Sequence, residues 1–291
     1  MTDAASWRLR EGDEITPELT AMRLLGGGSA YEAYLAYDEI TLSPVVVKVL
    51  RPDQVDDEGS LRGLEREVTA LEIANHPVVV RGLRHQLDGE RPHVVLENID
   101  GPRLSTLIRR HGRLSEQQYL ALGIDIASAL HFFGHVDVCH LDIKPSNVIM
   151  GAPARLIDLS VARSSASAEA LTSPIGTDLY MAPEQATPGE AGVPGHASDV
   201  WGLGATLFHA VAGYRPFDEG DPDAEADALR FPQLADEPYT LPDGVPGAVA
   251  KILYACLSPR PEARPLPAEV AEALEPVLAN QPRAKLSFKV R

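Results

Sequence analysis

The segment 140–147 constrains this chain more than any other, because it gathers several chemically active side chains in one short stretch. It reads His-Leu-Asp-Ile-Lys-Pro-Ser-Asn, and residues 156–160 follow as Leu-Ile-Asp-Leu-Ser. Short apolar runs separate two carboxylates, a cation and an amide, which are Asp142, Asp158, Lys144 and Asn147. Phosphoryl transfer needs one carboxylate for the attacking hydroxyl, a carboxylate and an amide oxygen for magnesium, and a cation for the developing charge. A surface loop with a capping aspartate is the alternative for such a motif alone.

The same run resembles the catalytic loop of the eukaryotic-type serine/threonine protein kinases, in a style closest to bacterial members. The resemblance extends over about residues 20–280, with the motifs in the required order. It implies an α+β, bilobal protein kinase fold, in which a small, mostly antiparallel β N-lobe with one main helix joins a larger, mostly α-helical C-lobe. The implied organisation is a leader at 1–19, an N-lobe at 20–98, a C-lobe at 99–280 and a basic tail at 281–291.

The composition agrees with this organisation and excludes some partners. A chain of 291 residues is longer than a single core usually grows, which favours two lobes. The net charge of −16 argues against general nucleic-acid binding, because phosphate backbones require clustered cations. No apolar run reaches the roughly 18 residues of a membrane span. The start lacks the pattern of a secretory signal, so we expect a cytoplasmic location.

A glycine-rich hairpin is expected at 22–36, where the sequence predicts a strand, a glycine turn and a second strand. The resemblance assigns Leu25, Gly26 and Gly28 to nucleotide binding. Glycines suit a loop whose backbone approaches phosphates closely with its N–H groups free, although a plain turn has the same composition. Tyr31 stands where the family has its third glycine, so we expect a stiffer or displaced loop tip.

The adenine pocket implied by the resemblance has two substitutions of opposite size. Ala33 stands at the family's valine and Val46 at its alanine, so the pocket volume is roughly kept, which cores tolerate best. We therefore expect Ala33 and Val46 on one face of the sheet, enclosing a base. Residues 93–101 resemble the hinge between the lobes, which assigns the backbone of Glu97 and Ile99 to the adenine edge.

Lys48 lies in the β-branched run 44–50 and requires a partner if it is buried. A helix is expected around 61–71, where apolar residues recur at helical spacing. Glu65 and Glu67 flank that apolar stripe about equally, so periodicity does not choose between them. The resemblance chooses Glu67 and implies that Lys48 holds the nucleotide phosphates. A lysine on an exposed strand face is the alternative.

In the C-lobe, further helices are expected after a capping box at Ser115, from 198 onward, and near 248–256 and 268–278. Residues 163–173, rich in Ser and Ala, are expected to be mobile. The acidic, proline-rich stretch 218–245 is expected to be solvated loop, with a docking site for a basic substrate as the alternative.

The resemblance also implies specific pairings in the C-lobe. Thr177 is expected to bond to Asp142 and Lys144. Glu184 is expected to pair with Arg264. Asp199 is expected either to bond to the backbone of the catalytic loop or simply to cap a helix.

Two further departures concern regulation. Leu141 replaces the arginine that receives the phosphate of an activated loop, so we expect activity that does not depend on phosphate docking at this position. Ser160 replaces the family's glycine two residues after Asp158, which narrows the backbone freedom there. With Tyr31, these departures favour the alternative of a pseudokinase scaffold that binds nucleotide or a partner protein without catalysis.

The resemblance implies a serine/threonine protein kinase that uses ATP and Mg²⁺ and acts on a protein with a Ser or Thr acceptor. Asp142, Lys144 and Thr177 form the implied catalytic group, and Asn147 and Asp158 are the implied metal ligands. Autophosphorylation and a homodimer are left open. A small-molecule kinase of the same broad fold is a third alternative, which shares the Asp and Asn spacing but lacks Lys144 and the segment 176–184.

Overall fold

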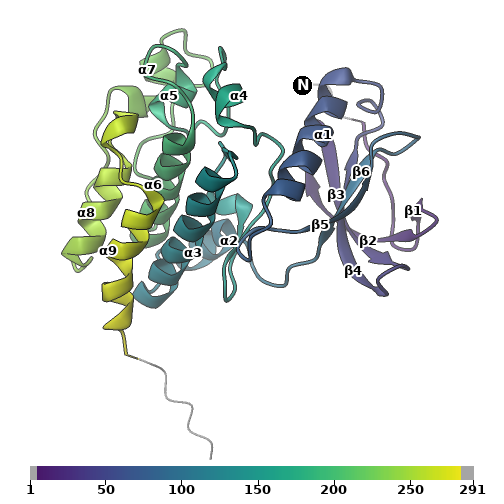
Figure 1. Cartoon of the computed structure of the whole chain (residues 1–291), viewed down its shortest axis with the longest axis horizontal. Coiled ribbons are helices and arrows are strands. Elements are labelled where there is room, and N and C mark those ends of the chain that lie inside the picture. Colours follow the sequence, from purple (N-terminus) through teal and green to yellow (C-terminus); the bar gives the residue numbers. More distant parts are fainter. Residues whose placement is uncertain (1–4, 283–291) are drawn as a thin grey trace, which may run out of the picture.

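The computed structural model describes residues 5–282 and consists of two lobes (Figure 1). A curled antiparallel sheet with helix α1 forms one lobe, and a bundle of helices forms the other. The α+β, bilobal architecture predicted from the sequence is therefore confirmed. Of the expected basic tail, residues 283–291 lie outside the described residues. No helix within 5–282 is both long and apolar enough to span a bilayer.

The N-lobe sheet has the strand order β1-β2-β3-β4-β6-β5. Its elements in chain order are β1 (Glu14–Thr16), β2 (Leu19–Gly27), β3 (Tyr31–Asp38), β4 (Ser43–Leu50), α1 (Glu58–Ile73), β5 (Gly82–Gln86) and β6 (His93–Glu97). Strand β1 lies in the segment that we expected only as a leader. Trp7 anchors the same segment, because its indole N–H donates to the carbonyl of Leu50 at 2.7 Å.

The register of β3 and β4 brings the expected pocket residues to one face of the sheet. Ala33 pairs with Lys48, and Leu35 pairs with Val46. Side chains two residues apart on a strand point to the same face, so Ala33 and Val46 share a face with Lys48. The expected placement of these two residues is confirmed.

Helix α1 presents one face to this sheet. Asp57 caps its start by accepting a hydrogen bond from the Ser60 N–H at 2.7 Å. Leu64 and Glu67 are buried at 0% and 1% exposure, whereas Glu65 is exposed. The direction in which the helix faces the sheet thus separates the two glutamates that helical spacing leaves equivalent.

The C-lobe is built around helix α6, which is buried on nearly all sides. Its elements are α2 (Leu104–His111), α3 (Glu116–His135), η1 (Pro145–Asn147), β7 (Val148–Ile149), β8 (Arg155–Leu156), α4 (Ser165–Glu169), α5 (Pro183–Ala186), α6 (His196–Ala212), α7 (Asp227–Arg230), η2 (Pro232–Leu234), α8 (Gly247–Cys256), η3 (Pro261–Ala263) and α9 (Pro267–Ala279). A Cβ on Gly202 would lie 2.9 Å from the Cβ of Ile143, so this glycine lets the catalytic loop rest directly on α6.

Two segments differ from the sequence-based expectations. Residues 163–173 were expected to be mobile, and the structure has within them the short helix α4, which Ser164 caps and the buried Ala168 anchors. The acidic stretch 218–245 contains α7 and η2. There Phe231 is 1% exposed, so part of this stretch is packed rather than solvated.

A buried ion pair, Glu184 with Arg264, fixes the chain in front of α6. The two side chains are 0% and 1% exposed, and two hydrogen bonds of 2.6 and 2.8 Å join them. Ser198 also donates to Glu184 at 2.6 Å. The remaining donors of Arg264 bond to the carbonyls of Ala197, Ser258 and Pro259. The predicted pair is confirmed, and its polar groups are well satisfied.

Replacing Arg264 with Met should lower the free energy of unfolding by about 3–5 kcal/mol, because Glu184 is left as an unpaired buried charge. Arg62→Ala is the matched control, since its ion pair with Glu58 has side chains that are 61% and 83% exposed. This control should leave the unfolding midpoint almost unchanged. Urea denaturation followed by tryptophan fluorescence measures both variants, and equal losses would contradict the assignment.

Candidate active site

Lys48 lies where the N-lobe sheet, α1 and the C-lobe meet. Its Nζ is 2.9 and 2.7 Å from the two carboxylate oxygens of Glu67 and 2.8 Å from Oδ1 of Asp158. The side chain is 13% exposed, so the alternative of a lysine on an exposed strand face is wrong. The structure selects Glu67 over Glu65 as its partner.

The Lys48 ammonium attracts both carboxylates, whereas burial and the nearby Asp158 raise the pKa of Glu67 above its ordinary value. Burial acts to lower the pKa of Lys48, but Glu67 and Asp158 outweigh it and raise the pKa above its ordinary value. Burial acts to raise the pKa of Asp158, but the Lys48 ammonium holds that pKa well below its usual range. Lys48 is therefore a cation and Asp158 an anion at neutral pH.

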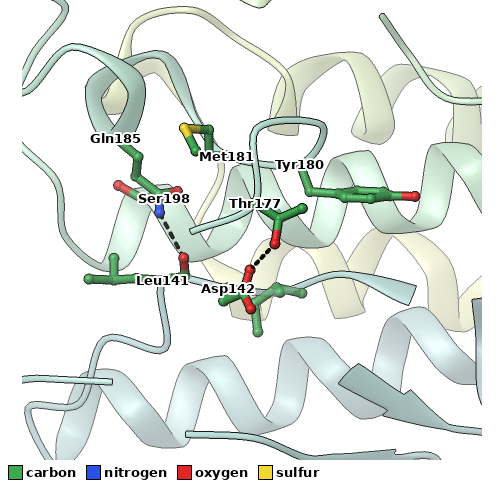
Figure 2. Close-up of a pocket in the computed structure, with 9 residues that line it drawn as sticks. Leu141, Asp142, Thr177, Tyr180, Met181, Gln185 and Ser198 are labelled. Atoms are coloured by element: carbon green, nitrogen blue, oxygen red, sulfur yellow. Dashed lines mark hydrogen bonds between the residues drawn. The ribbon is translucent and has the colours of Figure 1, made fainter. Parts of the chain in front are cut away.

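The catalytic loop holds Asp142 within a network of polar side chains. Thr177 donates to Oδ1 of Asp142 at 2.7 Å, and Lys144 donates to the Thr177 hydroxyl at 2.6 Å. Nζ of Lys144 is also 2.7 Å from Oδ2 of Asp142. Figure 2 shows Thr177 pointing at Asp142, with Tyr180 and Met181 on the same segment. The expected contacts of Thr177 are confirmed.

Asn147 is oriented so that its amide oxygen is available. Its Nδ2 donates to the backbone carbonyl and to Oδ2 of Asp142, both at 3.0 Å, so both amide protons are used. The Ile157 N–H donates to the Asn147 carbonyl at 2.9 Å, which brings the next residue, Asp158, alongside. Adjacent amide and carboxylate oxygens are the donors that Mg²⁺ prefers, so these residues fit a magnesium ion.

Asp199 supports the catalytic loop from α6. Its two carboxylate oxygens accept the N–H groups of His140 and Leu141 at 2.8 and 2.7 Å, so it is not a simple helix cap. Burial raises the pKa of Asp199 to about 7, although these two donors act to lower it. Leu141 has φ 62° and Asp158 has φ 69°, in the left-handed region. Such positions cost about 1–3 kcal/mol each, and the bond to Asp199 helps to hold Leu141 there.

Gln185 also supports this loop, and sequence reasoning missed it. Its Nε2 donates to the carbonyl of Leu141 at 2.8 Å (Figure 2). The same nitrogen donates to the carbonyl of Ile175 at 3.0 Å. A Cβ on Gly176 would lie 2.7 Å from the Leu141 carbonyl oxygen, so the chain passes very close there. In the sequence, the one hint of this role is that Gln185 directly follows Glu184.

Leu141 lies in an apolar cluster that joins the catalytic loop to the segment after Asp158. Cys139, Leu141 and Ala168 are 0–2% exposed, and three partly buried residues pack against them, namely Val161, Leu171 and Ile175. We call these six residues the Leu141 cluster. The Leu141 cluster joins the catalytic loop to the segment 161–175 by apolar contact.

The glycine-rich hairpin joins β2 to β3, with Leu25, Gly26 and Gly28 near its tip. The expectation of free N–H groups was wrong for Gly28, whose N–H donates to the Tyr31 carbonyl at 3.1 Å because the turn closes there. Gly26 has φ 145°, which favours glycine. Arg51 donates to the Gly28 carbonyl at 2.8 Å and thereby fixes the tip.

The hinge begins at Glu97, at the end of β6. Its N–H donates to the Arg81 carbonyl at 3.0 Å, and its carboxylate pairs with Arg155. Among residues 5–282, no group accepts a hydrogen bond from the Ile99 N–H. The pairing of Val45 with Glu97 and of Val46 with Leu96 brings the start of the hinge next to β4.

The segment 176–184 is held against α6 and η2. The Tyr180 hydroxyl and Nδ1 of His209 are 2.7 Å apart. Gln233 donates to the carbonyls of Asp178 and Met181, both at 3.1 Å. Burial lowers the pKa of His209 to about 4, and the nearby Arg215 acts in the same direction.

Comparisons with known proteins find relatives along most of the chain. A family model described as "Protein kinase domain" matches residues 19–274. The chain is 31% identical over 277 residues to "Serine/threonine-protein kinase PkaB" of Streptomyces coelicolor, which covers 91% of this chain and 64% of that protein. It is 34% identical over 244 residues to "Serine/threonine-protein kinase PknK" of Mycobacterium tuberculosis, which covers 80% of this chain and 21% of that protein.

A plant relative matches a similar region. The chain is 27% identical over 252 residues to "CBL-interacting serine/threonine-protein kinase 21" of Arabidopsis thaliana, which covers 85% of this chain and 58% of that protein. The chain therefore spans less than two thirds of the length of each of these three relatives.

Acidification should destabilise the protein through His209. An unfolded histidine takes up a proton near pH 6.5, whereas native His209 does so near pH 4. Within this window the unfolded state binds more protons, so stability falls as the pH falls. His209→Gln should therefore lose less stability between pH 7 and pH 4.5 than the wild type. Urea midpoints measure this, with the exposed His131→Gln as control, and parallel pH profiles of wild type and His209→Gln would contradict it.

Proposed function

The chain belongs to the eukaryotic-type serine/threonine protein kinase family, and on this premise we propose that it is an active enzyme. It transfers the γ-phosphoryl group of ATP to a Ser or Thr hydroxyl of a protein in the cytoplasm. The observation that carries this proposal is the meeting of Lys48, Glu67 and Asp158 in one ion cluster. Asn147, beside Asp158, joins that cluster to Asp142 through its amide.

In this proposal each group has a distinct task. Asp142 orients the acceptor hydroxyl and takes its proton, and Lys144 stabilises negative charge that develops nearby. Thr177 holds both side chains in register through its hydroxyl. Asn147 and Asp158 hold magnesium, which neutralises charge on the phosphates when it is bound.

Nucleotide recognition falls to the N-lobe and the hinge. Lys48, kept protonated and held by Glu67, binds the phosphates. The hairpin with Leu25, Gly26 and Gly28 covers them. The shared face of Ala33 and Val46 encloses the base, and the backbone of Glu97 and Ile99 meets its polar edge. Residues from both lobes therefore contribute to one site for Mg-ATP.

A pseudokinase scaffold is the second candidate, and one observation favours it. The Lys48 ammonium already contacts Glu67 and Asp158, and the Tyr31 ring lies 4.7 Å from its Nζ. A phosphate must therefore compete with groups of the protein. The presence of every side chain needed for transfer supports the active enzyme instead. Lys144 and the segment 176–184 are absent from small-molecule kinases of the same broad fold. The contact between Lys144 and Thr177 of that segment therefore supports a protein substrate over a small metabolite.

Asp142→Asn should lower phosphate transfer by about 10²- to 10⁴-fold, because no carboxylate then takes the proton of the substrate hydroxyl. The assay incubates the protein with labelled ATP and magnesium, alone for autophosphorylation and with a generic basic protein. Asp88→Asn, which changes an exposed N-lobe carboxylate, is the matched control and should retain full transfer.

Three outcomes would contradict the proposal. Wild-type protein that binds nucleotide without transfer would support the scaffold. Label that appears in a mixture of small metabolites, and not in protein, would support a small-molecule kinase. Equal labelling by wild type and Asp142→Asn would remove Asp142 from its assigned role.

The double change Thr172→Ala, Ser173→Ala should leave transfer within about twofold of wild type, because the Leu141 cluster orders the segment without a phosphate. Leu141→Asn should lower transfer, since Asn accepts the left-handed backbone but removes the apolar contact. A loss in the alanine variant that Thr172→Glu restores would contradict this. Such a result would point to Arg163, whose guanidinium lies near Arg66.

A further inference from the structure

Tyr31 connects three parts of the site. Its ring lies over Lys48, with Nζ 4.7 Å from the ring centroid. Its hydroxyl reaches the first turn of α1, 3.4 Å from the Ser60 carbonyl. Strand alternation puts Tyr31 on the same face of β3 as Ala33, two residues further on. A side chain from the glycine hairpin thus spans the space between that hairpin and α1.

Helix α1 has a glycine, Gly63, opposite this hydroxyl. Gly63 is buried, and a Cβ there would lie only 2.8 Å from the Tyr31 hydroxyl oxygen. A glycine inside a helix costs about 1 kcal/mol relative to alanine, so its presence here requires a compensating contact. Gly63 is one helical turn before Glu67, and residues at that spacing share a face. The space left by Gly63 is therefore filled by Tyr31 on the side that carries Glu67.

The position of Glu67 depends on where α1 lies. Its carboxylate meets Lys48 at 2.7 Å, so a movement of the helix by one or two ångströms would break the pair. Tyr31 and Leu61 pack against the large apolar core that includes Leu50 at the end of β4 and Leu64 of α1. This contact holds the N-terminal half of α1 against the strand that carries Lys48.

We propose that Tyr31 is a positioning residue for phosphate transfer, which couples the glycine hairpin to α1 through Gly63 and so holds Glu67 against Lys48. The inference rests on the proposed function for its kinetic consequences. Its structural part concerns α1 alone. In place of a third glycine, the hairpin carries a side chain that keeps the ion pair assembled.

The decisive experiment pairs Gly63→Ala with Tyr31→Phe. Gly63→Ala should raise the KM for ATP about fivefold, because its methyl group displaces the hydroxyl or the helix. Tyr31→Phe keeps the ring over Lys48, so the KM for ATP should change less than twofold. The double variant should return to the wild-type KM, because the hydroxyl that the methyl group meets is gone.

A purely structural role would not give this rescue. An alanine in the helix interior should raise the unfolding midpoint of the double variant, so stability and KM move independently. Tyr31→Ala should raise KM by about threefold to thirtyfold. In a Glu67→Gln background the same change should have little further effect, because Tyr31 acts through that residue.

Hydrogen exchange supplies a readout that needs no catalysis. Tyr31→Ala should speed amide exchange in 58–66 of α1, whereas Tyr31→Phe should not. If wild-type protein transfers no phosphate, the proposed function fails while exchange still decides the role of Tyr31. Unchanged exchange in Tyr31→Ala, or no rescue of Gly63→Ala by Tyr31→Phe, would overturn the inference. Tighter binding of Mg-ATP by Tyr31→Ala would also overturn it, since the ring would then cover the phosphate site.

Discussion

A buried ammonium group requires opposite charges around it, and this requirement at Lys48 organises the two lobes. The lysine comes from strand β4, Glu67 comes from helix α1, and Asp158 follows strand β8 of the other lobe. Removing one partner of a buried pair such as Lys48 and Glu67 costs about 3–5 kcal/mol, whereas Asp158 is 36% exposed and its pair is more strongly screened by solvent. The contacts of Lys48 therefore join β4 and α1 to the segment that follows β8 in the other lobe.

The catalytic loop depends on a buried carboxyl group, that of Asp199. Both carboxylate oxygens of Asp199 accept hydrogen bonds from the N–H groups of His140 and Leu141, although burial disfavours its ionised form. These bonds hold Leu141 in a left-handed backbone conformation, just before Asp142. Gly202 allows the loop to approach α6 closely enough for these bonds to form. A rigid central helix thus fixes the geometry of residues that lie on a loop.

The sequence predicts the lobes, the main helices and the residues of the site, because these have local patterns or known spacing. It does not choose between Glu65 and Glu67, since both flank the apolar stripe and only the packed sheet distinguishes them. The roles of Gln185 and Gly63 have no local sequence pattern, because each depends on a residue far away in the chain. Gln185 donates to the Leu141 carbonyl, and Gly63 makes room for the Tyr31 hydroxyl. Helix α4 was missed because a short Ser/Ala run is helical only once Ala168 is buried.

The three departures from the family pattern act in the same physical direction. At Tyr31 a large side chain replaces a flexible glycine and fills the space beside α1. At Leu141 an apolar cluster replaces a cation that could respond to a phosphate. At Ser160 a side chain narrows the backbone freedom, and its N–H lies 3.4 Å from Oδ1 of Asp158. Because apolar packing and restricted backbones do not respond to a change of charge, we propose that the site stays assembled and is not switched by phosphorylation.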